Sequence, residues 1–198
     1  MDDFDISPAA LPNTAPTITS GAGGSVGENS STSTVVYTAT ATDADSDTLT
    51  YSLSGTDAGS LAINSSTGAV TLNASANYEA KSSYSFNVDA LDATHTTSQA
   101  VTLNVTDVNE APNITSGTSG SVAENAATGT VVYTAAAADP ETGAVSYSLS
   151  GTDAASFSIN SSTGVVTLNA SANYEAKSSY SLSVIAADAA SNTVSKAV

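Results

Sequence analysis

The residues that could do chemistry in this chain are its carboxylates. The 198-residue sequence contains 19 Asp and Glu but only 3 Lys and Arg, which gives a formal net charge of −16. Thirteen of these acids fall in short motifs, whereas acids that only solubilise a surface would be scattered. Clustered carboxylates repel one another, so a cation is needed to hold them together. The motifs are therefore candidate cation-binding segments.

The motifs occur twice along the chain, with one unpaired segment between the two sets. The motif acids are Glu28 in VGEN and Glu124 in VAEN; Asp43, Asp45 and Asp47 in DADSD, with Asp139 and Glu141 in DPETG; Glu79 and Glu175 in NYEA; Asp92 in DALDA and Asp188 in AADAA; and Asp107 and Glu110 in DVNEAP. The other six are Asp2, Asp3 and Asp5 near the N-terminus and Asp57, Asp89 and Asp153, which we expect at turns or on exposed strand faces.

Composition excludes several function classes. Nucleic acids and anionic membranes are bound by clustered Lys and Arg, and this chain has only Lys81, Lys177 and Lys196. The absence of Cys excludes disulfides, thiolate zinc sites and a cysteine nucleophile. No apolar run reaches the ~20 residues of a membrane span. The one histidine, His95, lies in a polar hairpin without a partner nucleophile, so we expect a solvated loop residue and no enzyme activity.

An internal repeat organises the chain. APTITS at 15–20 returns as APNITS at 111–116, and TVVYTA at 34–39 returns at 130–135, an offset of 96 residues. The repeat predicts two tandem domains, which we place at 16–106 and 113–198, with a leader at 1–15 and a linker at 107–112. The second repeat stops at SKAV, inside what should be its last strand. We therefore expect a fragment of a longer repeat array.

Period-two alternation and turn residues predict an all-β fold with about seven short strands per domain, typical of a Greek-key β-sandwich. In the strand expected at 34–42, Val35, Tyr37, Ala39 and Ala41 would face the core. Further strands are expected at 48–53, 60–63, 69–72 and 84–92, and a last strand with Val101, Leu103 and Val105 inward. The tyrosines could form a sugar-stacking surface, but most fall on the inward face and are expected in the core.

The five motifs, four of which recur in the same order in both repeats, resemble those of cadherin repeats as found in large bacterial surface adhesins. The family pattern is an E-N pair, a D-x-D, an L-D-R-E, an A-x-D and a D-x-N-D-N-A-P linker. The segment YEAKSSYSFNVDALD at 78–92 also has the family's spacing E-x4-Y-x-φ-x-V-x-A-x-D, where φ is an apolar residue. The resemblance covers residues 16–198. It implies an immunoglobulin-like sandwich with Ca²⁺ bound between successive repeats, at an extracellular or cell-surface location.

Carried over position by position, the resemblance implies one shared calcium site built from the end of the first repeat, the linker and the start of the second. Ca²⁺ takes six to eight oxygen ligands, which carboxylates and amide carbonyls supply. The implied ligands are Glu28, Glu79, Asp107, Asn109, Glu110, Asp139, Glu141 and Asp188. A weaker half-site at the start of the first repeat comprises Asp43, Asp45, Asp47 and Asp92, and another half-site comprises Glu124 and Glu175.

The chain departs from the family pattern at three places. The linker DVNEAP is one residue short, Asn77 replaces the Asp of L-D-R-E, and Glu141 replaces the second Asp of D-x-D. The expectation is therefore two or three ions at the junction, held with reduced affinity.

Three function classes remain open from the sequence. The first is a calcium-rigidified spacer and adhesion module, whose partners are calcium, adjacent repeats of the parent protein, and a cell-surface glycan or another adhesin. The second is a carbohydrate-binding module, and the third an accessory domain of a secreted enzyme. Isopeptide bonds through Lys81 or Lys177 are not expected, because a lysine before a strand is ordinarily a solvated charge.

Overall fold

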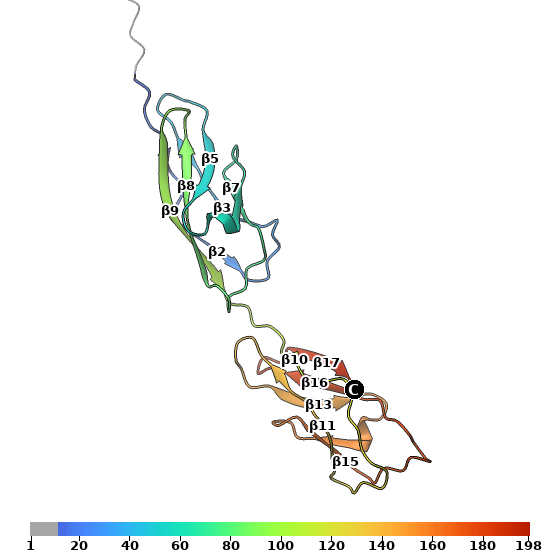
Figure 1. Ribbon diagram of the computed structural model, residues 1–198. Coiled ribbons are helices and arrows are strands. Elements are labelled where there is room, and N and C mark those ends of the chain that lie inside the picture. The colour runs from blue at the N-terminus through green and yellow to red at the C-terminus, as the bar shows by residue number, and fades with distance from the viewer. Residues whose placement is uncertain (1–11) are drawn as a thin grey trace, which may run out of the picture. The chain divides into compact units, whose positions relative to one another are not determined.

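The computed structural model describes residues 12–198, so most of the leader expected at 1–15, including Asp2, Asp3 and Asp5, lies outside the described residues. The chain divides into two compact units (Figure 1), one ending at Val108, here called unit 1, and one spanning Asn109–Val198, here called unit 2. Both units are built from β-strands joined by turns, with one short 3₁₀ helix each, at Ala58–Ser60 and Ala154–Ser156. The all-β expectation is confirmed.

Unit 1 consists of two main sheets and a short strand pair. The four-stranded sheet has the order β2-β9-β8-β5, the three-stranded sheet β3-β7-β6, and the pair is β1-β4. The strands are β1 (Thr17–Ile18), β2 (Gly23–Gly27), β3 (Val35–Thr38), β4 (Ala41–Thr42), β5 (Thr50–Ser54), β6 (Leu61–Ile63), β7 (Ala69–Leu72), β8 (Ser83–Leu91) and β9 (Thr96–Thr106).

Unit 2 repeats this architecture with a smaller first sheet. Its sheets have the orders β13-β16-β17 and β11-β15-β14, with the pair β10-β12. The strands are β10 (Asn113–Ile114), β11 (Val131–Thr134), β12 (Ala137–Ala138), β13 (Ser146–Ser150), β14 (Phe157–Ile159), β15 (Val165–Leu168), β16 (Ser183–Ala187) and β17 (Thr193–Ala197).

The core of unit 1 lies between its two main sheets and follows the predicted alternation on the long strands. Tyr84, Phe86 and Val88 on β8 pack in one cluster with Leu103 and Val105 of β9. These residues alternate with polar ones, because successive side chains of a strand point to opposite faces. The inward positions predicted for β9 are confirmed.

The alternation predicted for 34–42 is wrong at its start. Val35 is 52% exposed, whereas Val36 and Tyr37 are both buried. The register between β3 and β7 shifts between Val35 and Tyr37, which marks a β-bulge. A bulge inserts one residue into the strand and turns the side chains before it to the other face. The same irregularity recurs between Val131 and Tyr133 in unit 2.

One prediction about the charged residues outside the motifs is wrong. Asp89 was expected at a turn or on an exposed strand face, but it is buried on β8 and accepts a hydrogen bond from the Ser98 hydroxyl.

Lys81 was expected to be a solvated charge, and its side chain is 43% exposed. Its ammonium lies 3.0 Å from the carboxylate of Asp57 and over the Tyr84 ring. Unit 2 has the equivalent ion pair between Lys177 and Asp153, with the Lys177 ammonium over the Tyr180 ring.

Candidate metal centre

Glu28 is the most enclosed of the motif acids. It follows β2 directly and is only 3% exposed. One carboxylate oxygen accepts a 2.8 Å hydrogen bond from the backbone N–H of Tyr78, and the other accepts one of 2.8 Å from the backbone N–H of Val108. Buried carboxylates are stable when such donors replace water. Glu28 therefore fastens both the NYEA turn and the chain after β9 to the end of unit 1.

Glu79 and Asp107 lie at this same end of unit 1 and are exposed. A carboxylate oxygen of Glu79 lies within 4.8 Å of one from Glu28, and likewise within 4.8 Å of one from Asp107. The NYEA turn positions Glu79, because the Asn77 side chain accepts a hydrogen bond from the N–H of Ala80 and its carbonyl one from Lys81. The structure thus brings Glu79 close to Glu28, the other acid predicted for the end of the first repeat, and to Asp107, the first acid of the predicted linker.

Asp188 anchors the acidic end of unit 2. It is buried at the end of β16 and accepts hydrogen bonds from the side-chain amide of Asn109 and from the backbone and side-chain amide of Asn192. Burial alone would raise the pKa of Asp188, but these hydrogen bonds outweigh it and leave the pKa below its ordinary value. Asp188 is therefore held as a carboxylate.

Glu141 and Asp139 are the other two acids predicted for the start of the second repeat. Glu141 accepts a 2.8 Å hydrogen bond from the backbone N–H of Glu110, which is the main reason why the pKa of Glu141 is lowered. The outer oxygens, Oδ2 of Asp139 and Oε2 of Glu141, are buried, and no hydrogen-bond donor in residues 12–198 reaches them. Buried carboxylate oxygens without donors are unfavourable unless a cation contacts them.

The half-site at the start of unit 1 has the same design. Asp92 is buried and accepts hydrogen bonds from the backbone N–H groups of Thr94 and His95 and from the side chain of Asn13. Although burial opposes it, the hydrogen bonds from His95 and Thr94 lower the pKa of Asp92 to about 2. The His95 ring is exposed and lies 3.4 Å from Asp92, consistent with the predicted loop residue.

Asp43, Asp45 and Asp47 lie on the neighbouring loop. Asp43 Oδ1 accepts the backbone N–H groups of Asp45 and Asp47, and its buried Oδ2 has no hydrogen-bond partner in the described part of the chain. The hydroxyl and backbone N–H of Thr14 both donate to Asp45, and the hydroxyl bond contributes most to lowering the pKa of Asp45.

The hydrogen bonds around Asp92 in unit 1 and around Asp188 in unit 2 correspond residue by residue at the 96-residue offset. Asn13 donates to Asp92 as Asn109 donates to Asp188, and the N–H of Thr14 reaches Asp45 as that of Glu110 reaches Glu141. Two differences affect the chemistry. A hydroxyl stands in the first segment where the second has the carboxylate of Glu110, and Asp47 stands in the first unit where the second has Gly143.

The remaining motif acids, Glu124 and Glu175, lie in unit 2 and are exposed. A hydrogen bond shared with the Glu124 carboxyl lowers the pKa of Glu175. Glu124 is the repeat equivalent of Glu28, yet it lacks the enclosure that Tyr78 and Val108 give to Glu28.

Sequence reasoning missed the backbone donors that hold these acids. Residue types do not reveal that the backbone N–H groups of Tyr78, Val108 and Glu110 donate hydrogen bonds to carboxylates distant in the chain. The predicted half-site of Asp43, Asp45, Asp47 and Asp92 likewise did not include Thr14, whose hydroxyl and N–H donate to Asp45. The recurrence of Asn13, Ala15 and Pro16 as Asn109, Ala111 and Pro112, which places Thr14 opposite Glu110, is the signal that could have found it.

Two β-sandwich units in tandem, with carboxylates gathered at their ends, define a class of extracellular repeat proteins. A cadherin domain model matches residues 23–106 and again 118–198, so the chain belongs to the cadherin family. Cadherin repeats are extracellular adhesion modules. No curated protein matches the chain. No helix in residues 12–198 is long and apolar enough to cross a membrane.

Solved cadherin structures are similar over both units together. Human protocadherin-24 EC1-2 is 26% identical, with 94% of each chain covered and a TM-score of 0.67. Mouse cadherin-23 EC22-24 is 28% identical, covering 92% of this chain and 62% of that one, with a TM-score of 0.58. Drosophila N-cadherin EC1-4, at 21% identity and a TM-score of 0.64 over 94% of this chain and 49% of that one, shares the fold.

Proposed function

We propose that this chain is a calcium-binding spacer and adhesion segment of a larger secreted bacterial adhesin, in which Ca²⁺ between the repeats makes the tandem rigid. The proposed ligands are oxygens from the end of unit 1, the linker and the start of unit 2. They come from the carboxylates of Glu28, Glu79, Asp107, Glu110, Asp139, Glu141 and Asp188 and from Asn109.

The observation that carries the proposal is the pair of buried oxygens on Asp139 and Glu141 that no donor reaches in residues 12–198. Each of these acids uses its other oxygen for a backbone N–H, from Gly143 and Glu110 respectively. The acids are thereby oriented, with one oxygen left for a cation. Hard carboxylate oxygens suit Ca²⁺, which supplies the positive charge that this acidic chain lacks.

Covalent continuity of the linker supports a shared site. The N–H of Val108 is bound by Glu28 in unit 1, and the side chain of Asn109, the next residue, is bound by Asp188 in unit 2. Consecutive Cα atoms are about 3.8 Å apart across a trans peptide bond. The chain therefore passes directly from the anchor of one acidic group to the anchor of the other.

The number of ions follows from the ligands present. The one-residue-shorter linker and the Asn at position 77 reduce the oxygen count relative to the family pattern, so we propose two or three ions at reduced affinity. The half-site of Asp43, Asp45, Asp47 and Asp92 is proposed to be weaker, because it includes no counterparts of the acids Glu28, Glu79 and Asp107 that the proposed junction set contains.

The test is the metal content of the purified chain, followed by calcium titration of the chelated protein. Calcium that binds only the folded state stabilises it by RT ln(1 + [Ca²⁺]/Kd), about 2.7 kcal/mol at a hundredfold excess over Kd. We expect two or three bound calcium ions at the junction and a higher melting temperature in millimolar calcium than in EDTA. No bound calcium and an unchanged melting temperature would overturn the proposal.

A further inference from the structure

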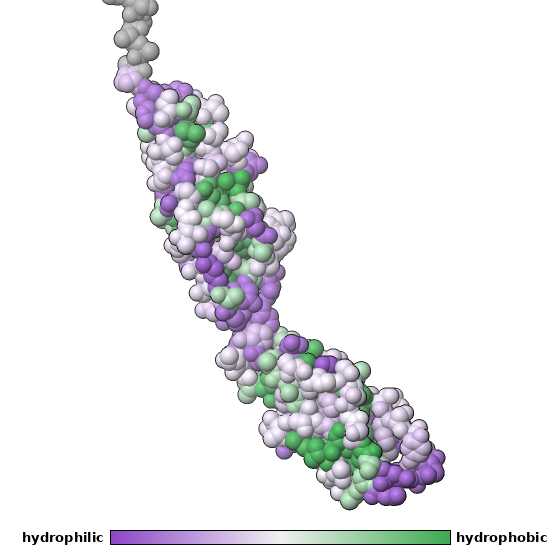
Figure 2. All heavy atoms as spheres, in the orientation of Figure 1, coloured by the Kyte–Doolittle hydropathy of each residue, from purple (hydrophilic) through white to green (hydrophobic). Residues whose placement is uncertain are grey.

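Glu79 is exposed, so the position of its carboxylate depends on the turn that carries it. This turn, NYEA at residues 77–80, lies at the end of unit 1 from which the chain leaves, where Figure 2 shows hydrophilic residues gathered. Binding an ion costs free energy when the ion has to order a mobile ligand, and a turn that is already fixed lowers this cost. The contacts that fix residues 77–81 therefore bear on the affinity of Glu79 for a cation.

Backbone hydrogen bonds hold the first part of the turn. The N–H of Tyr78 donates to the carboxylate of Glu28. The N–H of Ala80 donates to the side chain of Asn77, and the N–H of Lys81 donates to the Asn77 carbonyl. Of these contacts, the one with Glu28 joins the turn to another segment, and it does so before position 79.

The side chain of Lys81 joins the end of the turn to β8. Its ammonium lies 3.0 Å from Oδ1 of Asp57 and 5.3 Å from the centre of the Tyr84 ring. The N–H of Asp57 donates to the carbonyl of Ser85 on β8 (3.0 Å), and Oδ2 of Asp57 accepts the N–H of Ser85 (2.7 Å). The Ser85 N–H above all, and then the Lys81 ammonium, hold the pKa of Asp57 below its ordinary value. Asp57 is therefore an ionised acceptor fixed to β8.

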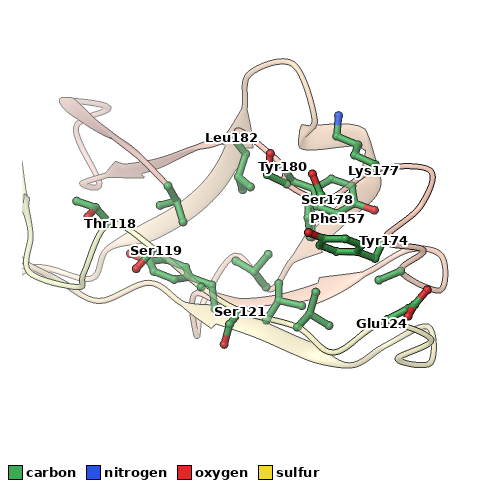
Figure 3. Close-up of a pocket in the computed structure, with 18 residues that line it drawn as sticks. Thr118, Ser119, Ser121, Glu124, Phe157, Tyr174, Lys177, Ser178, Tyr180 and Leu182 are labelled. Carbon is green, nitrogen blue, oxygen red and sulfur yellow. The ribbon is translucent and has the colours of Figure 1, made fainter.

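The same contacts recur in unit 2. The Lys177 ammonium lies 2.5 Å from Oδ1 of Asp153 and 5.2 Å from the centre of the Tyr180 ring. Oδ2 of Asp153 accepts a 2.7 Å hydrogen bond from the N–H of Ser181. In Figure 3, the Lys177 side chain points away from Glu124, the acid of the VAEN motif. In both units the lysine therefore pairs with the aspartate that precedes the 3₁₀ helix.

We propose that Asp57 is a positioning residue for the calcium ligand Glu79, acting through the ammonium of Lys81. The ion pair fixes the end of the turn, as the hydrogen bond from Tyr78 to Glu28 fixes its start, so the Glu79 carboxylate is in place before a cation arrives. The inference rests on the proposed function, since it takes Glu79 as a calcium ligand. A partly exposed ion pair of this kind should change the calcium affinity by about two- to fivefold.

The test is calorimetric calcium titration of the full 198-residue chain and its variants. Lys81→Met and Asp57→Asn each remove one partner of the ion pair, and each should raise the calcium Kd by about two- to fivefold. The direction of the change in Lys81→Met separates position from charge. Lys81 is the only basic residue of unit 1, so its loss makes this unit more negative, and charge alone would tighten calcium binding. Lys81→Arg keeps a cation at this position and should bind calcium more tightly than Lys81→Met.

Further variants distinguish positioning from a general loss of stability. Lys177→Met breaks the equivalent ion pair in unit 2 and should leave the calcium affinity of the junction close to that of the wild type. The double variant Asp57→Asn/Lys81→Met should bind calcium no more weakly than the weaker single variant, because both changes break the same pair. In EDTA, the amides of Ala80 and Lys81 should exchange hydrogen faster in Lys81→Met than in the wild type, since the end of the turn is then less restrained.

Calcium binding by Lys81→Met that equals or exceeds that of the wild type would overturn the inference and leave the proposed function standing. Three other results would do the same: an equal loss of affinity in Lys177→Met, losses that add up in the double variant, and unchanged exchange at Ala80 and Lys81. A wild type that binds no calcium would overturn the proposed function and this inference together.

Discussion

The backbone N–H of Val108 donates a 2.8 Å hydrogen bond to the carboxylate of Glu28, eighty residues earlier in the chain. This bond fixes the first residues after β9 to the end of β2, so the linker starts from a defined position. The other carboxylate oxygen holds the NYEA turn through Tyr78. Glu28, which we propose as a calcium ligand, therefore also holds two backbone segments of unit 1 in place.

This arrangement predicts that Glu28→Gln destabilises unit 1 even in EDTA. Gln keeps the size but offers one acceptor and one NH₂ donor, so one of the two backbone N–H groups loses its partner. The expected cost is about 1–3 kcal/mol in the free energy of unfolding of unit 1. Hydrogen exchange at the buried amide of Val70 reads the stability of this unit separately.

Glu124→Gln is the matched control, because the VxEN motif is the same but Glu124 is exposed. Its effect on unit 2, measured at the buried amide of Val166, should stay within about 0.5 kcal/mol. Equal losses of unfolding free energy in the two units would mean that the two backbone hydrogen bonds of Glu28 do not add to the stability of unit 1.

Asp92 provides a prediction about pH. Its pKa of about 2 lies below the ordinary aspartate value of about 4, so the ionised form stabilises the folded state. That contribution is fully present above pH 4 to 5 and is lost as the pH falls towards 2. In EDTA, the stability difference between the wild type and Asp92→Asn should therefore be constant near neutral pH and shrink in acid.

The measurement is denaturant unfolding of both proteins at intervals between pH 2 and 7. Direct observation of the Asp92 carboxyl by ¹³C NMR should give a midpoint near 2. A midpoint near 4, with a stability difference that does not change with pH, would show that the donors from Thr94 and His95 do not favour the ionised form.

The sequence was sufficient for the architecture because the repeat and the alternation are strong signals. The inward positions Leu103 and Val105 follow from period two alone. The same rule failed at Val35, because a bulge adds a residue without leaving a mark in the residue types. It also failed at Asp89, whose burial depends on the hydroxyl of Ser98 on the neighbouring strand.

The candidate site was predictable in its members and less so in its construction. Repetition of the acidic motifs identified the carboxylates that gather at the unit ends, such as Asp139 and Glu141. Their orientation depends on backbone N–H groups, which every residue except proline carries and which sequence therefore cannot distinguish.

A bridging ion predicts that calcium restricts motion between the units. Without calcium, the acids at the junction repel one another and the DVNEAP linker is free to bend. Small-angle scattering in millimolar calcium should give a narrower distance distribution than in EDTA, at the same protein concentration and ionic strength. Magnesium at equal concentration controls for screening by a divalent ion, since Mg²⁺ prefers a smaller octahedral shell. Superimposable curves in calcium and EDTA would count against a bridging ion.

The repeat provides the sharpest test of the ligand assignment, at Glu79 and Glu175. Both lie in the sequence NASANYEAKSSYS, so replacing either with Ala should perturb the local turn equally. Their surroundings differ, because Glu79 lies within 4.8 Å of Glu28 and of Asp107, whereas Glu175 has the exposed Glu124 as its acidic neighbour.

If Glu79 is a calcium ligand, Glu79→Ala should weaken calcium binding by about 1–3 kcal/mol, or roughly 5- to 150-fold in Kd, and reduce the calcium-dependent melting shift. Glu175→Ala should leave both quantities close to those of the wild type. Calorimetric calcium titration of the two variants, with melting curves in EDTA to separate local effects, measures the difference. Equal losses of calcium affinity would mean that this glutamate shapes the turn in each unit, and Glu79 would then have to be removed from the ligand set.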